Sequence, residues 1–349
     1  MASTEQLSTA RIRQPAPGAA LVEAAPLDAL GLREMPTDTH FLRDHFGIPD
    51  LDPEGWTLEL AGDGRGVSLT LDDLKSMRSV SLSVVLECAG HRRSEYEPAA
   101  RGVGWGIGAV SEAVWTGVRL RDVLELLGTH VLNGHVLLEG ADAGLVGDAE
   151  TYSSFARGMP LDKAMDEDTI LAWEMNGEPL PRAHGAPLRA IVPGWYATDS
   201  VKWLARIEIL DAPFAGHFEV SDYRLSTREG ATRMTTLPIS SLITSHGDGA
   251  VVSSGLHDLS GIAWGGRDGV ARVEISIDDR PWQPTQLERS TARHGRSFWQ
   301  AEWEAAPGTH VIRVRATDGA GRTQPDEPVW NERGFANASV HRVRLDVTG

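Results

Sequence analysis

The sequence contains one cysteine among 349 residues, so no disulfide can form within the chain. Intramolecular disulfides are typical of oxidising compartments, and their exclusion fits a reducing one. A zinc site is also a poor fit, because there is no second cysteine and no paired-ligand spacing. Cys88 is therefore the one thiolate that the chain offers to a metal or an electrophile.

Basic residues are few, and long apolar runs are missing. Lys and Arg number 33 against 49 Asp and Glu, which gives a net charge of −16. Nucleic acids and anionic membranes are bound through basic faces, so neither is an expected partner. No apolar run approaches the roughly 18 residues of a membrane span, and residues 1–14 carry no apolar signal core and no twin arginine. These features predict a cytoplasmic protein, or a periplasmic one if a signal has been removed.

Composition and patterning divide the chain into three parts. Hydrophobic residues make up 41% of the chain, a globular value, and its length predicts more than one domain. Residues 1–38 are rich in Ala and Pro and are typical of an extended arm. Residues 39–236 mix strand and helix patterns, whereas 237–349 show short alternating strands without a helix pattern, as in an immunoglobulin-like sandwich. The expected fold class is α+β: a mixed α/β domain followed by an all-β sandwich.

Local patterns predict individual elements. Thr70 can cap a short helix at 71–77, and helical spacing at 118–127 ends at Gly128, a C-cap signal. Asn176-Gly177 predicts a hairpin turn. Alternating or apolar runs predict strands at 56–60, 67–71, 81–87, 170–175, 188–192, 201–210, 270–277, 297–303, 310–316 and 341–347.

The main chemical signal surrounds Cys88. This residue follows the predicted strand 81–87 and opens the loop Cys88-Ala-Gly-His-Arg-Arg93. A lone cysteine is more often a small buried apolar residue, but the neighbouring arginines favour the thiolate, the reactive and metal-binding form. Two interpretations fit the residues: a ligand to a metal, or a nucleophile with His91 or His184 as its base.

Two further clusters offer cationic side chains from predicted loops. One is His40-Phe-Leu-Arg43-Asp-His45, and the other is Pro181-Arg-Ala-His184-Gly-Ala-Pro-Leu-Arg189, with Lys202 following. Glycine and proline in the second set tight turns. Either cluster alone is compatible with a solvated surface. Three cationic clusters and a thiol together indicate a functional site.

These motifs, in this order, resemble the sulfite oxidase family of molybdopterin oxidoreductases over nearly the whole chain. The segments that carry the resemblance are 40–45, 86–93, 104–109, 115–118, 181–189, 201–204, 222–223 and 330–334. The resemblance implies a molybdopterin-binding catalytic domain of sulfite oxidase type at 39–236. It also implies a dimerisation domain at 237–349 and a homodimer.

The resemblance also implies roles for individual residues. Cys88 would bind molybdenum directly, and a molybdopterin dithiolene and oxo groups would supply the other ligands. The residues implied to hold the substrate or line its pocket are Arg43, Arg93, Trp105, Tyr223 and Arg333. Those implied to hold the cofactor are Phe41, Arg43, His45, Asp142, His184, Arg189 and Lys202. Arginine suits an oxyanion because its planar guanidinium forms paired hydrogen bonds.

The implied reaction is the molybdenum-dependent oxidation of sulfite to sulfate by oxygen-atom transfer. No haem-binding segment is recognisable, so the electrons would pass to a separate acceptor. Tyr223 and Arg333 favour sulfite over the alternative, a reductase of the same family acting on nitrate or another small oxo compound. A cysteine hydrolase and a pterin-carrying binding protein are further alternatives. Asp44 and His91 stand where the family usually has asparagine, which puts the local charge in doubt.

Overall fold

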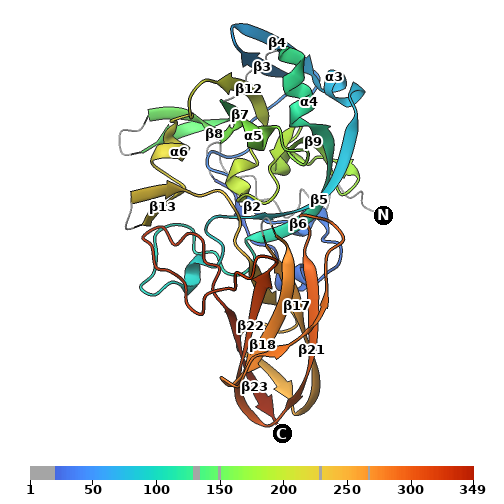
Figure 1. The fold of residues 1–349 in the computed structure, drawn as a ribbon, viewed down its shortest axis with the longest axis vertical. Coiled ribbons are helices and arrows are strands. Elements are labelled where there is room, and N and C mark those ends of the chain that lie inside the picture. Colours follow the sequence, from blue (N-terminus) through green and yellow to red (C-terminus); the bar gives the residue numbers. More distant parts are fainter. Residues whose placement is uncertain (1–19, 129–133, 148–150, 228–229, 266–267) are drawn as a thin grey trace. The chain divides into compact units, whose positions relative to one another are not determined.

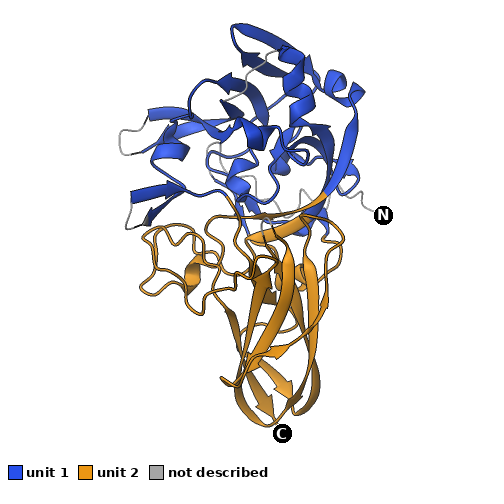
Figure 2. Cartoon of the chain, viewed as in Figure 1, with its two compact units in different colours: residues 1–23, 36–82, 113–235 blue, residues 24–35, 83–112, 236–349 orange. Residues whose placement is uncertain are grey.

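The computed structural model describes residues 20–128, 134–147, 151–227, 230–265 and 268–349. The chain divides into two compact units (Figure 2). Unit 1 comprises the described parts of 1–23, 36–82 and 113–235, and unit 2 those of 24–35, 83–112 and 236–349. Strands β5 (Ser79–Glu87) and β6 (Val110–Arg119) each run from one unit into the other. The cysteine loop between these strands therefore belongs to unit 2.

Unit 1 is built on two sheets with short helices (Figure 1). The first has the order β4-β3-β12-β7-β8, in which β3 and β12 are parallel and the other pairs are antiparallel. Its strands are β3 (Thr57–Gly62), β4 (Arg65–Thr70), β7 (His135–Val146), β8 (Thr151–Pro160) and β12 (Leu204–Leu210). The second has the order β10-β9-β6-β5, and β11 also pairs with β9. These added strands are β9 (Ile170–Met175), β10 (Glu178–Pro179) and β11 (Arg189–Ile191).

The remaining elements of unit 1 are short. Two pairs of antiparallel strands lie outside the sheets: β1 (Val22–Glu23) with β2 (Leu42–Arg43), and β13 (Arg224–Thr227) with β14 (Gly230–Arg233). The helices are α3 (Leu71–Ser76), α4 (Leu120–Leu124), α5 (Leu161–Ala164) and α6 (His217–Val220). Of the predicted arm, residues 1–19 lie outside the described residues.

Local sequence signals explain most of these boundaries. The Thr70 hydroxyl accepts from the N–H of Asp73 at 3.1 Å, and the Asp73 carboxylate accepts from the N–H of Thr70 at 2.8 Å. This capping box confirms the predicted start of α3. Asn176 and Gly177 both have positive φ in the β9–β10 hairpin, as predicted. Gly128 ends its helical segment at φ 57°.

The helix predicted at 118–127 starts two residues later than expected. Val118 and Arg119 complete β6, where Val118 pairs with Leu171 of β9. Helix α4 begins at Leu120 and passes into a 3-10 turn at residues 125–127. Val118 is fully buried, so its place in the sheet outweighs the helical spacing of its segment. Similarly, β12 begins at Leu204 instead of the predicted residue 201.

Unit 2 contains a sandwich of two sheets, drawn in orange to red in Figure 1. One sheet has the order β15-β17-β21-β20 and the other β16-β23-β22-β18-β19. The strands of the first are β15 (Ser240–Ile243), β17 (Gly255–Trp264), β20 (Gln286–Glu288) and β21 (Ser297–Ala305). Those of the second are β16 (Ala250–Ser253), β18 (Val270–Ile277), β19 (Gln283–Pro284), β22 (Gly308–Asp318) and β23 (His341–Thr348).

The sandwich core confirms the predicted alternation. Inward-facing residues of both sheets, among them Leu259, Trp299, Ile312 and Leu345, form one buried cluster. Among the described residues after 236 there is no helix. Helix α2 (Leu27–Leu30) also belongs to unit 2, where Leu30 packs in a second cluster. The α+β expectation, with an immunoglobulin-like sandwich at the C-terminal end, is confirmed.

No helix in the described segments has the length and apolarity to cross a membrane.

Gly117 provides a test of the packing between β6 and β9. An added Cβ at this position would lie 1.9 Å from the carbonyl oxygen of Leu171. We expect Gly117→Ala to lower the free energy of unfolding by about 2–3 kcal/mol, because backbone atoms cannot move away as a flexible side chain can. Chemical denaturation measures the effect. Gly66→Ala in β4 is the control, since its Cβ would meet only Leu60 O, at 3.6 Å; equal losses would contradict the prediction.

Candidate functional site

Backbone hydrogen bonds hold the cysteine loop of unit 2. Cys88 directly follows β5, is 8% exposed, and donates its N–H to the carbonyl of Ala109 at 2.9 Å. Within the loop, the N–H of His91 donates to Cys88 O at 2.9 Å, and that of Arg93 donates to Gly90 O at 3.1 Å. These turns fix the thiol at a strand end, where functional side chains are commonly presented.

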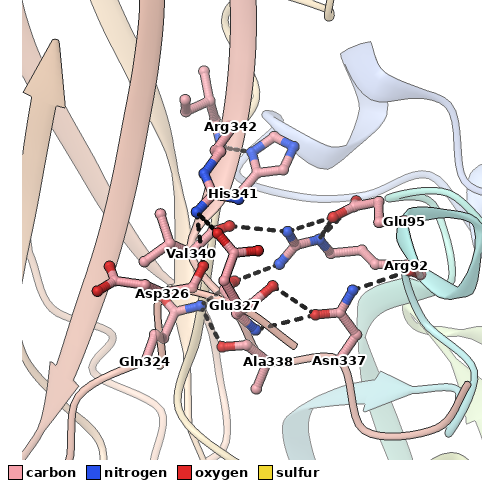
Figure 3. A network of polar contacts seen from close by, with 12 residues as sticks. Arg92, Glu95, Gln324, Asp326, Glu327, Asn337, Ala338, Val340, His341 and Arg342 are labelled. Carbon is pink, nitrogen blue, oxygen red and sulfur yellow. Dashed lines mark hydrogen bonds and ion pairs between the residues drawn. The ribbon is translucent and has the colours of Figure 1, made fainter. Parts of the chain in front are cut away.

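Arg92 anchors this loop to the C-terminal segment of unit 2 (Figure 3). Its buried guanidinium pairs with Glu95 at 2.6 Å and donates to the carbonyls of Ser339 at 2.6 Å and Val340 at 3.2 Å. Asn337 Nδ2 donates to the carbonyl of Arg92 at 3.1 Å. Arg92 has φ 57°, a left-handed conformation that non-glycine residues seldom adopt. The hydrogen bonds therefore hold a strained turn in place.

Arg93 has a guanidinium that the backbone orients. Its Nε donates to Arg333 O at 2.7 Å and its Nη1 to Val103 O at 2.8 Å, and the group lies 5.1 Å from the centre of the Phe335 ring. Three glycines leave room for this side chain. An added Cβ would lie within 2.7 Å of it at Gly90, Gly102 and Gly334. The plane of the guanidinium is thus fixed, which suits paired hydrogen bonds to an oxyanion.

Trp105 and Arg333 lie in loops that adjoin this arginine. Trp105 is buried, and its carbonyl accepts from the N–H of Ser94 at 2.9 Å. Arg333 is exposed, and its carbonyl is the acceptor for Arg93 Nε. The structure therefore places four predicted site residues, Cys88, Arg93, Trp105 and Arg333, on neighbouring loops of unit 2.

Two buried polar residues of the cysteine region, Glu87 and His91, contact Trp264. Trp264 Nε1 donates to Glu87 Oε2 at 2.7 Å. Burial raises the pKa of Glu87 to about 7, against the hydrogen bond from Trp264 and the charge of Arg92. The His91 ring packs against Trp264 at a centroid distance of 5.8 Å, and burial holds the pKa of His91 well below its usual value. His91 is thus a neutral, packed side chain.

A second group of predicted site residues lies in unit 1. The members are Phe41, Arg43 and His45 at or beside β2, Asp142 in β7, His184, Arg189 at the start of β11, and Lys202 before β12. Arg189 Nη1 donates to His184 O at 2.9 Å, and its Nη2 donates to Ser200 O at 3.0 Å. Gly185 has φ 111°, and an added Cβ would lie 2.9 Å from that of Lys202. Only glycine permits this close approach.

Five buried or partly buried charges form what we call the cation cluster: Arg43, Asp44, Asp142, Arg189 and Lys202. Burial lowers the pKa of Lys202 to about 8, although the charge of Asp44 raises it, and burial lowers the pKa of Arg189 to about 9. Burial raises the pKa of Asp142 to about 7, against the charge of Lys202. Three bases therefore face two carboxyl groups, of which Asp142 is only partly ionised near neutral pH.

The cation cluster has unmet polar capacity. Among the described residues, Arg43 Nη1 and Asp142 Oδ1 are buried without a hydrogen-bond partner. Burial, followed by neighbouring positive charges, also holds the pKa of His45 and of His184 well below the usual value, so both are neutral. Buried charges are stable when paired. The excess of cations is therefore suited to an anionic ligand such as a phosphate ester.

Tyr223 forms a pair with His45, a member of this group. The Tyr223 hydroxyl lies 3.0 Å from His45 Nε2, and the His45 ring stacks on Phe155 at 5.0 Å. The Arg157 guanidinium lies 5.5 Å from the centre of the Tyr223 ring. Tyr223 has φ 49°, so its position depends on these contacts as well as on its backbone.

Arg157 belongs to a buried ion network that sequence reasoning missed. Its Nε lies 3.1 Å from Asp199 and 3.4 Å from Glu219, and Arg233 contacts the same two carboxylates. Arg157 and Asp199 are fully buried. The available signal was an arginine within the buried second half of β8, where Phe155, Ala156 and Met159 are apolar. Its partners are far away in the sequence, which is why pattern reading could not pair them.

Within the described ranges, no group of three or more His, Cys, Asp or Glu side chains is arranged to hold a metal ion.

Comparison with known families matches almost the whole chain. The family model for the oxidoreductase molybdopterin binding domain matches residues 45–218, and that for the Mo-co oxidoreductase dimerisation domain matches residues 231–348. Among solved structures, the sulfane dehydrogenase SoxCD from Paracoccus pantotrophus superposes with a TM-score of 0.80 at 24% identity. The superposition covers 97% of this chain and 89% of that one, which shows a shared fold.

Several curated proteins are similar over most of this chain. It is 35% identical to mitochondrial sulfite oxidase of Homo sapiens, over 90% of this chain and 62% of that protein. It is 36% identical to sulfite oxidase of Gallus gallus, over 91% and 74%. It is 34% identical to the NAD(P)H nitrate reductase of Hordeum vulgare, over 89% and 39%. The chain thus spans less than two thirds of the mammalian relatives that it matches.

Asp142→Asn tests the electrostatics of the cation cluster in cofactor-free protein. The folded-state pKa of Asp142 is raised to about 7, so the folded form binds the proton more tightly than the unfolded form. Stability from this group is present below its unfolded pKa and is lost as pH rises through 7. We expect the stability gained by the variant to grow from about pH 4 to 7 and then level off. Denaturation at several pH values checks this, and a pH-independent difference would contradict it.

Proposed function

Because the chain belongs to the sulfite oxidase family of molybdopterin oxidoreductases, we propose that it oxidises sulfite to sulfate by oxygen-atom transfer. Electrons would pass to a separate acceptor. The observation that carries this proposal is the loop from Cys88 to Arg93, where a buried thiol and an oriented guanidinium are held together in unit 2. Relatives named sulfite oxidase at 35–36% identity support the choice of substrate.

The cofactor of this family is molybdopterin carrying molybdenum, and the residues present fit it. When bound, this group supplies the metal and the oxo chemistry of oxygen-atom transfer. Cys88 offers the soft thiolate ligand from the chain. In unit 1, the cation cluster and the buried Nη1 of Arg43 suit a phosphorylated pterin. We therefore assign Phe41, Arg43, His45, Asp142, His184, Arg189 and Lys202 to cofactor binding.

The remaining predicted residues are assigned to the substrate. Arg93, with Nε and Nη1 fixed on carbonyls, presents a guanidinium of set orientation, and Arg333 adds an exposed one. Arg43, in unit 1, is the third arginine that the resemblance assigns to the substrate. Trp105 is buried and excludes water. The Tyr223 hydroxyl lies within hydrogen-bond distance of Nε2 of the neutral His45, which orients the phenol.

Nitrate reduction is the second candidate, which the barley nitrate reductase at 34% identity supports. Tyr223 and Arg333 favour sulfite. Assays of sulfite and of nitrate with the same metal-loaded protein distinguish the two. A sulfite oxidase transfers electrons from sulfite to an artificial acceptor. A nitrate reductase transfers electrons from a reduced dye to nitrate. Metal-loaded protein that reduces no acceptor with sulfite would exclude the first candidate.

We also propose a catalytic part at 39–236 and a homodimer formed through 237–349, which the match to a dimerisation domain supports. Mass measurement in solution tests the dimer. The cytoplasmic compartment stays a prediction from the sequence.

Cys88→Ser tests the metal ligand. We expect molybdenum to fall from about one per chain to a small fraction, because a serine hydroxyl is a poor ligand for a soft site. Elemental mass spectrometry measures the loss. Pterin content, assayed separately, should fall less, since the cation cluster is unchanged. Full molybdenum content in the variant would refute the assignment.

Arg93→Gln tests substrate binding apart from metal loading. Charge-assisted hydrogen bonds contribute roughly 1.5–3 kcal/mol each, so kcat/KM for sulfite should fall by about 10–150-fold. Molybdenum content should be unchanged. Arg272→Gln, an exposed arginine on β18 of the same unit, is the control and should leave kcat/KM unaltered. Similar losses in both variants would contradict the role of Arg93.

A further inference from the structure

Asp44 is a buried carboxylate of the cation cluster, and its two oxygens have different surroundings. Oδ1 accepts the N–H of Leu21 at 3.1 Å and that of Gly47 at 2.8 Å, which closes the turn after β2. Oδ2 is buried and accepts no hydrogen bond among the described residues. It lies 3.9 Å from Lys202 Nζ. One oxygen thus serves the backbone, and the other faces a cation.

Only some of the N–H donors of Lys202 have an acceptor among the described residues. Its Nζ donates to Ala183 O at 3.2 Å and lies 4.1 Å from the centre of the Trp203 ring. An ammonium has three N–H donors, so donors remain beyond the one given to Ala183. The distance to Asp44 is too long for a hydrogen bond. The carboxylate therefore acts on Lys202 through its charge while leaving those N–H groups available.

We propose that Asp44 is the internal counter-ion of the cation cluster, which balances Lys202 in cofactor-free protein and opposes the anionic group of the cofactor when it binds. This inference rests on the proposed function in one respect, the assignment of Lys202 to the cofactor. Burial lowers the pKa of Lys202, and Asp44 has the largest effect among the neighbouring charges that raise it. The charge of Asp44 thereby stabilises the cation cluster when no cofactor is bound, and it lowers the affinity of the cluster for the cofactor.

The physical reason is the cost of burying like charges together. Lys202 is surrounded by Arg189 and Arg43, and both lower its pKa. Without Asp44, the partly ionised Asp142 would be the one carboxyl group of the cluster beside three cations in a poorly solvated region. Asp44 removes part of that repulsion. A phosphate that binds the same ammonium must approach the Asp44 carboxylate, and at such short range two anions repel in a poorly solvated site.

Asp44→Asn removes the charge of the side chain but keeps the acceptor that closes the turn. The asparagine side chain keeps an Oδ1 acceptor for Leu21 and Gly47 and removes the charge at the second position. Asp44→Ala removes both functions and is the matched control. If the charge matters, Asp44→Asn differs from wild type; if only the turn matters, Asp44→Asn matches wild type and Asp44→Ala alone is impaired.

The first measurement is the melting temperature of full-length, cofactor-free protein. We expect Asp44→Asn to lower Tm by about 2–4 °C, and Asp44→Ala to lower it further. In the background of Lys202→Met, the effect of Asp44→Asn should shrink to less than half, because the partner charge is gone. An unchanged Tm for Asp44→Asn, or an equal drop in both backgrounds, overturns the inference.

The second measurement is the release of molybdopterin from loaded protein, followed by the fluorescence of the oxidised pterin. We expect Asp44→Asn to release it about tenfold more slowly than wild type, since one repelling charge is removed. Release as fast as or faster than wild type overturns the part that concerns the cofactor. Wild type that never carries molybdopterin overturns that part and the proposed function together, while the melting temperatures still decide the ion pair.

Discussion

Positive charge taken out of water is the constraint on which this structure depends. Arginine and lysine are rarely buried unless they are paired. Here Arg189, Arg157, Arg92 and Arg93 are buried, and Lys202 is mostly buried. The chain manages them in different ways. Arg157 and Arg92 pair with carboxylates, whereas Arg189 and Arg93 donate to backbone carbonyls, which orient the guanidinium. The first arrangement forms buried ion pairs, and the second sets the orientation of a guanidinium.

This distinction separates adjacent residues that look alike in the sequence. Arg92 and Arg93 follow each other in the cysteine loop, but Arg92 joins Glu95 and the carbonyls of residues 339 and 340. Arg93 is surrounded by glycines and lies over Phe335. One arginine thus fixes the loop so that its neighbour can be presented at a defined angle. Overall acidity does not conflict with an anionic substrate, because the attraction is local.

Much of the fold could be predicted from alternation, capping and turn residues. The capping box at Thr70, the hairpin at Asn176 and the strand at 270–277 depend on neighbours in the sequence, so local patterns suffice. The helix start near Val118 was misplaced because pairing with β9 is a tertiary effect. Arg157, Asp199 and Glu219 were missed for the same reason. The roles of the site residues stay predictions, since geometry alone does not name a ligand.

The interleaving of the two units along the chain has a consequence for biosynthesis. Residues 83–112, which include the cysteine loop, emerge from the ribosome before any of 236–349, yet they belong to the same unit. The carbonyls of Ser339 and Val340, which secure Arg92, are translated almost 250 residues after it: the separations are 247 and 248 residues. Until then the turn at Arg92 has Glu95 as a partner but lacks these two carbonyls. The Cys88 loop therefore reaches its final conformation only after both parts of unit 2 have been translated.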